Sequence, residues 1–433
     1  MSSLEAHLRE LCTRARFGMD LGLDRARAAL AEAGDPHLDL ACLHVTGSNG
    51  KGSTCAMIES IARAAGLRTG LYTSPHLARF AERVRIDGEP IEDAAFEDAL
   101  GRALRLVNGE LTFFECLTAA AFLAFRAASI DLAVLEVGLG GRLDATNVIA
   151  RPLACAITTL SLEHTAVLGP TLSAIAREKA GILKPGAPYV IGHLPAEAER
   201  AVDEIARAVG AGPQQRVREE ASAEPADVRY RRVDRALHIT APDGREVRAE
   251  PGLVGRHQAA NAALACALAW HLSARWPAVA PAIPAGLATA RWPARFERLP
   301  AERGVTVLFD GAHNDEGITA LLDTLHEECF LPERTVLVFG ALADKPFEAM
   351  LLRLAARAHR RVYTAPKGRA PAALGDLARV APGDMEPEPA AALSRALDLA
   401  APGDTVLVTG SLYLVGELRA HLLGLPSDPV IAL

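Results

Sequence analysis

Short apolar runs rich in Val, Ile and Leu alternate with longer segments rich in Ala, Leu, Arg and Glu along most of this chain. Such an alternation is typical of parallel strands joined by crossover helices. It predicts strands at residues 41–45, 69–72, 132–137, 153–158 and 189–191, and helices at 54–65, 115–127 and 261–270. The pattern therefore predicts an α/β fold built on a mostly parallel sheet.

The rhythm changes twice further along the chain. Residues 228–254 alternate polar and apolar side chains around the turn signal Pro242-Asp243-Gly244, which predicts a two-stranded hairpin at a small antiparallel edge. Residues 276–300 are rich in Pro, Ala and Trp, as linkers are. Strands are expected again at 305–309, 335–339, 361–364 and 405–408. We therefore expect a first domain over residues 1–290, a linker over 291–297 and a smaller Rossmann-like α/β domain over 298–433.

Composition excludes several classes of protein. The 433 residues carry a formal net charge of −7 and no Lys/Arg-rich block, which argues against a nucleic-acid partner. The longest apolar stretches fall short of the ~20 residues that span a bilayer, and the polar start lacks a signal core, so we expect no membrane contact and a cytoplasmic protein. The seven cysteines form no CxxC pair and are expected to be reduced. No segment suggests an interface, and a monomer is expected.

The stretch "HVTGSNGKGST" (residues 44–54) follows a predicted strand and precedes a predicted helix. In that setting its backbone amides and the helix N-terminus converge on an anion, with Lys51 as a point charge and Ser53 or Thr54 as a hydroxyl. The standard P-loop has four residues between its glycines and Ser or Thr after the lysine; here two intervene and Gly52 follows. A turn that merely connects strand and helix is therefore the alternative.

Polar residues also follow the next predicted strands. "LAVLEVGLGGRLDATN" ends a strand with Glu136, and a carboxylate there, beside a phosphate loop, can hold Mg²⁺. "TTLSLEHTAVLG" places Glu163 and His164 after the following strand. A solvated acid and a structural histidine are the alternatives at these positions.

These and further motifs closely resemble the folylpolyglutamate synthase family, including its bacterial bifunctional form with dihydrofolate synthase activity, among the Mur-ligase-like ATP-dependent amide ligases. The resemblance runs nearly end to end through "YTSPHLARFAERVRIDGEPI", "TFFE", "EHTAVLGPTLSAIAREKAGILKPG", "GRHQAANAALA", "RWPARFE", "FDGAHN", "VFGALADKP" and "GSLYLVGE". It implies a P-loop ATP-binding domain with a pterin or folate site and a C-terminal Rossmann-like glutamate ligase domain. The implied reaction joins L-glutamate to dihydropteroate and to folates, with ATP and Mg²⁺, through an acyl phosphate.

The resemblance also implies roles for single residues. The nucleotide contacts are Gly47, Asn49, Gly50, Lys51, Gly52, Ser53, Asn261, Arg295 and Asp310. The magnesium positions are Ser74, Glu136 and His164, although imidazole is an uncommon ligand for so hard a cation. Thr112, Phe114 and Asp144 match positions that hold the pterin, and Phe114 can stack on a flat ring. Lys51, Lys179, Asp310 and His313 are the implied catalytic residues, and Lys179 matches a lysine that the family carries as a carbamate. Without the resemblance, Lys179 reads as a surface lysine and Phe114 equally well as a core residue.

Three positions depart from the family pattern. Glu163 stands where the family has Asp, Ser48 where it has Thr, and Ala294 where it has Gly. A longer acid could move His164, whereas Ser48 keeps its hydroxyl.

Three rival functions remain at this stage. The chain could have folylpolyglutamate synthase activity alone, or be another Mur-like ligase that extends a cell-wall precursor, although "TSPHL" and "TFFE" argue against the latter. A regulatory P-loop ATPase would leave "FDGAHN" and "RWPARFE" without a role.

Overall fold

The computed structural model describes residues 3–14 and 22–428, which form two compact units. The first unit comprises residues 1–75, 81–252 and 257–291, and the second comprises 76–80, 253–256 and 292–433. In the described ranges, no helix has both the length and the apolar character needed to cross a membrane.

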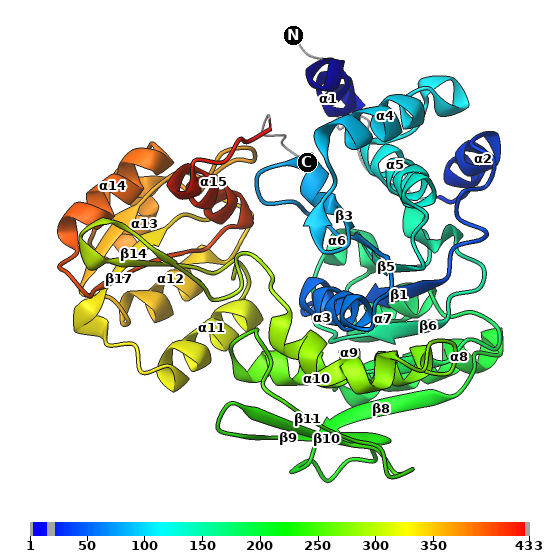
Figure 1. Cartoon of the computed structure of the whole chain (residues 1–433). Coiled ribbons are helices and arrows are strands. Elements are labelled where there is room, and N and C mark those ends of the chain that lie inside the picture. Colours follow the sequence, from blue (N-terminus) through cyan, green and yellow to red (C-terminus); the bar gives the residue numbers. More distant parts are fainter. Residues whose placement is uncertain (1–2, 15–21, 429–433) are drawn as a thin grey trace. The chain divides into compact units, whose positions relative to one another are not determined.

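The first unit is built on one long sheet (Figure 1). Its strands, from edge to edge, are β11 (Glu246–Ala249), β10 (Ala236–Thr240), β9 (Val228–Val233), β8 (Gln214–Glu219), β7 (Tyr189–Ile191), β6 (Ala154–Ile157), β1 (Cys42–Thr46), β5 (Leu132–Glu136), β2 (Thr69–Tyr72), β3 (Val84–Ile86) and β4 (Glu89–Pro90). Neighbours from β9 to β2 are parallel, and those beyond are antiparallel. The predicted mostly parallel sheet is confirmed.

Helices cover this sheet. They are α1 (Ser3–Arg14), α2 (Asp24–Glu32), α3 (Lys51–Ala64), α4 (Asp93–Ala103), α5 (Phe113–Ala128), α6 (Thr165–Leu168), α7 (Leu172–Ala180), α8 (Ala196–Val209), α9 (Arg256–Leu272) and α10 (Val279–Thr289). The strands β1, β2, β5, β6 and β7 are buried throughout, which is why they read as continuous apolar runs. The buried cysteines 42, 55, 116, 155 and 266 carry free thiols, as does the exposed Cys329.

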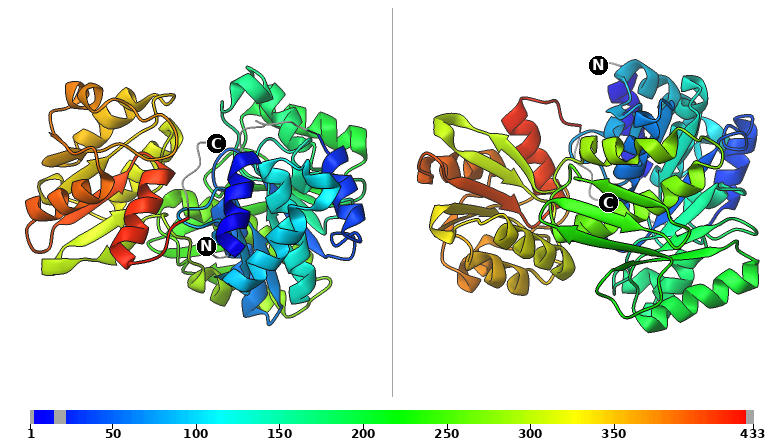
Figure 2. Two further views of the ribbon diagram at one scale, coloured as in Figure 1. Left: turned by 90° about the horizontal axis from the view of Figure 1, so that it is seen from above. Right: turned by 60° about the horizontal axis from the view of Figure 1, so that its bottom comes forward.

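Two expectations from the sequence need correction. The segment 276–300 is not linker throughout, because residues 279–289 form α10, a helix that contains Pro284 and packs against α3. The predicted antiparallel edge has three strands rather than two, and only its second turn, at Pro242-Asp243-Gly244, was identified. Figure 1 shows these strands, in green, at the lower edge of the unit, and the right-hand view of Figure 2 brings them toward the viewer.

The second unit is a smaller sheet in the order β12 (Glu297–Pro300), β13 (Thr306–Phe309), β17 (Thr405–Thr409), β14 (Thr335–Phe339), β15 (Arg360–Tyr363) and β16 (Asp384–Met385). All pairs are parallel except β12 with β13. Its helices are α11 (Asp315–Glu327), α12 (Phe347–Ala355), α13 (Leu374–Val380), α14 (Pro389–Leu399) and α15 (Leu412–Leu423). Separate apolar clusters that include Leu337 and Val338 lie on the two faces of the sheet, since neighbouring residues of a strand point to opposite sides. The predicted doubly wound α/β arrangement is confirmed.

Candidate active site

The glycine-rich stretch forms a tight loop between β1 and α3. Gly47 has a φ of +149°, and a Cβ there would lie 1.9 Å from Thr158 Oγ1. Gly50 is the left-handed N-cap of α3, and a Cβ there would lie 2.4 Å from Asn261 Oδ1. Both positions therefore require glycine, because any side chain would meet backbone strain and a close neighbour.

Hydrogen bonds from the β6 end hold the loop in place. Asn49 O accepts from the hydroxyls of Thr158 and Thr159, at 2.5 and 3.2 Å, and Asn49 N donates to Thr159 Oγ1 at 3.1 Å. Ser48 Oγ accepts from Ser161 N at 3.0 Å. The threonine that is usual at this position could make the same hydrogen bond with its own hydroxyl. The first helical hydrogen bond runs from Thr54 N to Gly50 O, so the amides of residues 51–53 have no acceptor within the helix. This helix start can bind an anion.

Two lysines converge on one oxygen of this loop. Lys51 Nζ donates to Gly47 O at 2.8 Å and to Ser48 O at 3.1 Å, and Lys179 Nζ donates to the same Gly47 O at 2.8 Å. Lys179 is buried on α7 and pairs with Glu163 at 2.8 Å. Burial and the charge of Lys51 lower the pKa of Lys179 to about 8. The reading of Lys179 as a surface lysine is therefore wrong.

Asn261 lies over this loop from α9. Its Nδ2 donates to Gln258 Oε1 at 3.0 Å, and Gln258 Nε2 donates to Ser53 Oγ at 3.4 Å. Gln258 is 1% exposed and was missed in the sequence, although its position three residues before Asn261 places both on one helix face.

A buried carboxylate stands at the end of β5, next to β1. Glu136 is 4% exposed, and its Oε2 accepts from Ser74 N at 3.1 Å. Cys55, one turn into α3, feels both charges: burial and Glu136 raise the pKa of its thiol, and Lys51 opposes them. The structure thus brings Ser74 and Glu136 together on the same side as the phosphate loop.

His164 is placed differently from this pair. It is the left-handed N-cap of the short helix α6, with an exposed imidazole. In the described ranges no three His, Cys, Asp or Glu side chains group as metal ligands do. The oxygen donors Ser74 and Glu136 fit a magnesium ion that keeps several waters and phosphate oxygens, whereas an imidazole does not suit it.

Two of the residues matched to pterin contacts flank Gly138. A Cβ on Gly138 would lie 2.4 Å from Phe114 Cζ and 3.1 Å from Asp144 Oδ2. The Phe114 ring also lies near Tyr72, with 6.1 Å between ring centroids. Burial raises the pKa of Asp144, partly offset by hydrogen bonds from Thr146 and backbone amides. The hydroxyl of Thr112 serves another purpose: it caps α5 by accepting from Glu115 N at 3.3 Å.

A hydrogen bond links the strand that leads into the phosphate loop to the segment that follows Gly138. Thr46, the last residue of β1, donates its hydroxyl to Gly140 O at 2.7 Å. The charge of Asp144 also acts on Lys179, raising its pKa slightly against the larger effects described above. A flat aromatic wall and an anion-binding loop therefore lie side by side in the first unit.

Three further predicted residues gather around Gly311 in the second unit. Asp310 directly follows the last residue of β13, and its two oxygens accept from Phe296 N and Ala312 N, both at 3.0 Å. A Cβ on Gly311 would lie 2.6 Å from Arg295 NH1, and Gly311 O lies 2.8 Å from His313 Nδ1. Burial raises the pKa of Asp310, opposed by Arg295.

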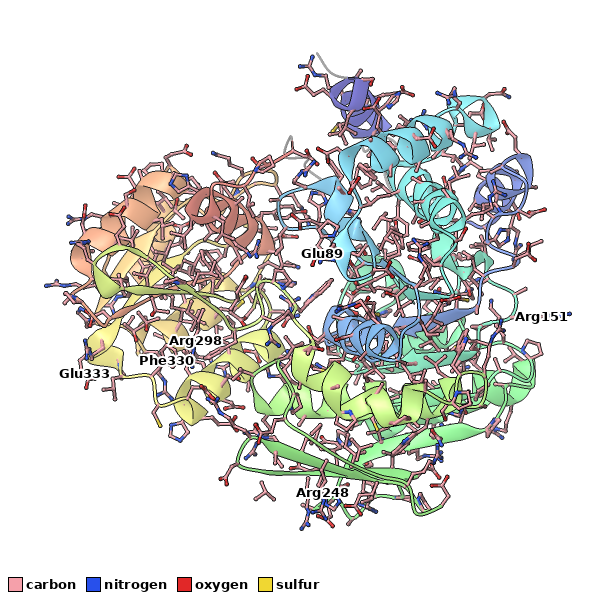
Figure 3. The ribbon with its side chains drawn as sticks, in the orientation of Figure 1. Glu89, Arg151, Arg248, Arg298, Phe330 and Glu333 are labelled. Atoms are coloured by element: carbon pink, nitrogen blue, oxygen red, sulfur yellow. The ribbon has the colours of Figure 1, made fainter. Side chains whose placement is uncertain are left out.

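The segment that carries Arg295 is anchored by stacked side chains. Arg298 lies over the rings of Phe296 and Phe330, 5.3 and 5.1 Å from their centroids, and Figure 3 labels Arg298 and Phe330 side by side. Ala294 adopts a φ of +59° in the apolar core. This backbone conformation explains why glycine is usual there, since alanine pays about 1 kcal/mol or more for it.

Two family models and several known proteins are similar to this chain. The Mur ligase middle domain matches residues 45–269, and the Mur ligase glutamate ligase domain matches residues 294–412. The dihydrofolate synthase/folylpolyglutamate synthase of Bacillus subtilis is 33% identical over 94% of this chain and 96% of that protein. A probable bifunctional folylpolyglutamate synthase/dihydropteroate synthase of Haloferax volcanii is 40% identical over 93% of this chain, which spans about half the length of that relative. The structure of Escherichia coli FolC in complex with DHPP and ADP matches with a TM-score of 0.83 and 31% identity, covering 98% of both chains.

Proposed function

The chain belongs to the dihydrofolate synthase/folylpolyglutamate synthase family of Mur ligases, and from this premise we propose that it is an ATP-dependent ligase that joins L-glutamate to dihydropteroate and to folates. The observation that carries the proposal is the hydrogen bond from Thr46 to Gly140, which sets the anion-binding loop beside the Phe114 and Asp144 corner. A ligase of this kind has to hold a triphosphate next to a ring-bearing acid.

The proposed reaction follows from the chemistry of a carboxylate, whose negative charge repels an amine. ATP transfers its γ-phosphoryl group to the carboxylate, which gives an acyl phosphate and ADP. The glutamate amine attacks the acyl carbon and loses a proton, phosphate leaves, and the amide remains. Lys51 and the helix amides neutralise the charge that develops on the transferred group. For this, Lys51 has to leave Gly47 O and turn to the phosphate.

Magnesium, when bound, supplies charge neutralisation at the phosphates. We propose Ser74 and Glu136 as its protein ligands; His164 remains a prediction from the family pattern. Arg295, Asp310 and His313 are proposed as nucleotide and catalytic contacts, and Asn261 as a nucleotide contact. Removal of the metal with EDTA should stop the reaction, and added Mg²⁺ should restore it.

We propose that Lys179 forms a carbamate. A pKa of about 8 leaves a useful fraction of the amine unprotonated and able to attack CO₂ near neutral pH. The ion pair with Glu163 opposes this step, because it favours the ammonium form. Incubation with ¹³CO₂ should give a carbamate carbon signal that Lys179→Met lacks, and an unchanged spectrum would contradict the proposal.

One coupled assay tests the function. ADP release should depend on glutamate, first with dihydropteroate and then with tetrahydrofolate as the acid. Activity with tetrahydrofolate alone would identify a folylpolyglutamate synthase without the first activity, and activity only with cell-wall precursors would identify another Mur ligase. ATP hydrolysis that ignores glutamate would refute the ligase.

The monomeric state and cytoplasmic location are also proposals. Light scattering after size-exclusion chromatography should give the mass of one chain, and a stable dimer would contradict the first of them.

A further inference from the structure

Three polar side chains in the first unit form a buried series, in which each is hydrogen-bonded to the next. His44 and Thr146 are fully buried and Asp144 is 4% exposed. His44 Nε2 lies 2.8 Å from Thr146 Oγ1, and Thr146 Oγ1 lies 2.6 Å from Asp144 Oδ1. His44 sits in β1, between β5 and β6, where a polar ring is costly unless it is hydrogen-bonded. The proposed roles above make no use of His44.

The donors around Asp144 decide where the protons lie. Its Oδ1 also accepts from Thr146 N at 3.0 Å, and its Oδ2 accepts from Leu139 N at 2.9 Å. A backbone N–H can only donate, so both oxygens of the carboxylate act as acceptors. The single hydroxyl proton of Thr146 then goes to Asp144, and Thr146 Oγ1 in turn accepts from His44.

This arrangement fixes the tautomer of His44. The proton must be on Nε2, which leaves Nδ1 unprotonated. No described residue lies within hydrogen-bonding distance of Nδ1, and a buried N–H there would lack an acceptor. Burial and the nearby Lys184 lower the pKa of His44 to about 3, so the ring is neutral. Cys155, its partner in β6, is a thiol whose pKa burial raises to about 12.

We propose that His44, acting through Thr146, is a positioning residue that sets the wall on which the ring of the acid substrate rests. The inference rests on the proposed function. Asp144 accepts from Leu139 N, and the preceding Gly138 lies so close to Phe114 and Asp144 that an added Cβ would come within 2.4 Å of the ring and 3.1 Å of the carboxylate. Without the donor His44, the Thr146 hydroxyl is no longer fixed in orientation and its hydrogen bond to Asp144 weakens. The carboxylate is then held only by backbone N–H groups, so it positions the Gly138–Leu139 backbone less firmly. The nucleotide loop has its own anchors at Thr158 and Thr159 and is not affected.

Equilibrium binding separates this role from a general structural one. His44→Leu removes the donor at similar volume, and it should weaken dihydropteroate binding by about tenfold or more, as loss of a hydrogen bond in a series ending on a charge does. The Kd for ADP should stay within about twofold. His44→Gln offers an N–H at similar reach and should restore most of the affinity. His37→Leu is the matched control, because it removes another buried imidazole of the same unit and should change neither Kd.

Thr146→Val provides an independent route to the same effect. It should weaken dihydropteroate binding as His44→Leu does, and the double variant should be no weaker than either single variant, since both break one series. Additive losses, equal losses for ADP and dihydropteroate, or a His44→Gln variant no better than His44→Leu would each overturn the inference.

The native chain supplies a test that needs neither a variant nor turnover. The ¹⁵N shifts of His44 should show a neutral ring protonated on Nε2 from about pH 5 to about pH 8, and an Nδ1–H ring or an imidazolium would overturn the inference. The two proposals fail differently. A native chain that binds no dihydropteroate refutes the proposed function, whereas a native chain that binds it as tightly as His44→Leu refutes only the role of His44.

Discussion

Replacing Gly286 by alanine is expected to destabilise the first unit, although alanine is the better helix former. Gly286 lies inside α10 against α3, where an added methyl carbon would lie 2.3 Å from Ile61 Cα and 2.7 Å from Ile61 N. Comfortable contacts between carbons are about 3.5–4.0 Å, and backbone atoms cannot rotate away, so the helices must separate by about 1.2–1.7 Å. Overpacking of this kind costs about 1–3 kcal/mol, and we take the upper end.

Helix propensity recovers up to about 1 kcal/mol, which leaves a net loss of about 2 kcal/mol. In a unit of this size that loss lowers Tm by roughly 4–8 °C. Calorimetric melting of the native and variant chains measures it, and because α3 begins at the phosphate loop, titration with ADP should show weaker binding. Gly375→Ala in α13 is the control, since an added methyl there meets no atom within 4 Å and should be neutral or slightly stabilising. A Gly286→Ala chain that melts at or above the native Tm would show that α3 and α10 accommodate the methyl group without a loss of stability.

Three further outcomes are expected. Lys51→Ala should abolish glutamate-dependent ADP release while circular dichroism stays native, because the cation at the phosphate is lost; a fully active variant would contradict the loop assignment. Asp144→Ala should reduce the use of dihydropteroate far more than that of tetrahydrofolate in the coupled assay, and equal losses would argue against a pterin-specific role. The pKa of Lys179 falls from an ordinary 10.5 to about 8, so between these values the unfolded chain binds more protons and the free energy of unfolding should rise with pH. Urea titrations across that interval should show a flatter rise for Lys179→Met, and identical slopes would contradict burial of the ammonium.

The strands could be predicted from the sequence because burial on both faces leaves a plain apolar run, as in β1, β5 and β14. The helix α10 could not, since Pro and Ala favour a linker by local criteria and the contact with Ile61 that stabilises the helix comes from a distant part of the chain. Edge strands such as β4 are too short to show a period.

The candidate site divides in the same way. An anion-binding loop could be predicted from Gly47, Gly50 and Lys51 themselves, since glycine permits a tight turn and lysine carries a positive charge. The structure shows the positive φ values that require the two glycines. Gln258 and His44 gave no such signal, because each acts through a partner brought near only by folding. Residue roles taken from the family pattern, such as those of Thr112 and His164, remain predictions.

The shared hydrogen bonds to Gly47 O have a consequence for how tightly this protein can hold a nucleotide. The ammonium groups of Lys51 and Lys179 both donate to this one carbonyl oxygen, and their positive charges repel each other. The nearby carboxylate of Glu163 offsets only part of that repulsion. When a phosphate binds, it replaces Gly47 O as a hydrogen-bond acceptor of Lys51, because this ammonium group already has an acceptor in the protein. The binding free energy that the phosphate contributes comes mainly from its negative charge, which the carbonyl oxygen lacks. Removing phosphates from the nucleotide should therefore lower its affinity more than changing the nucleoside does.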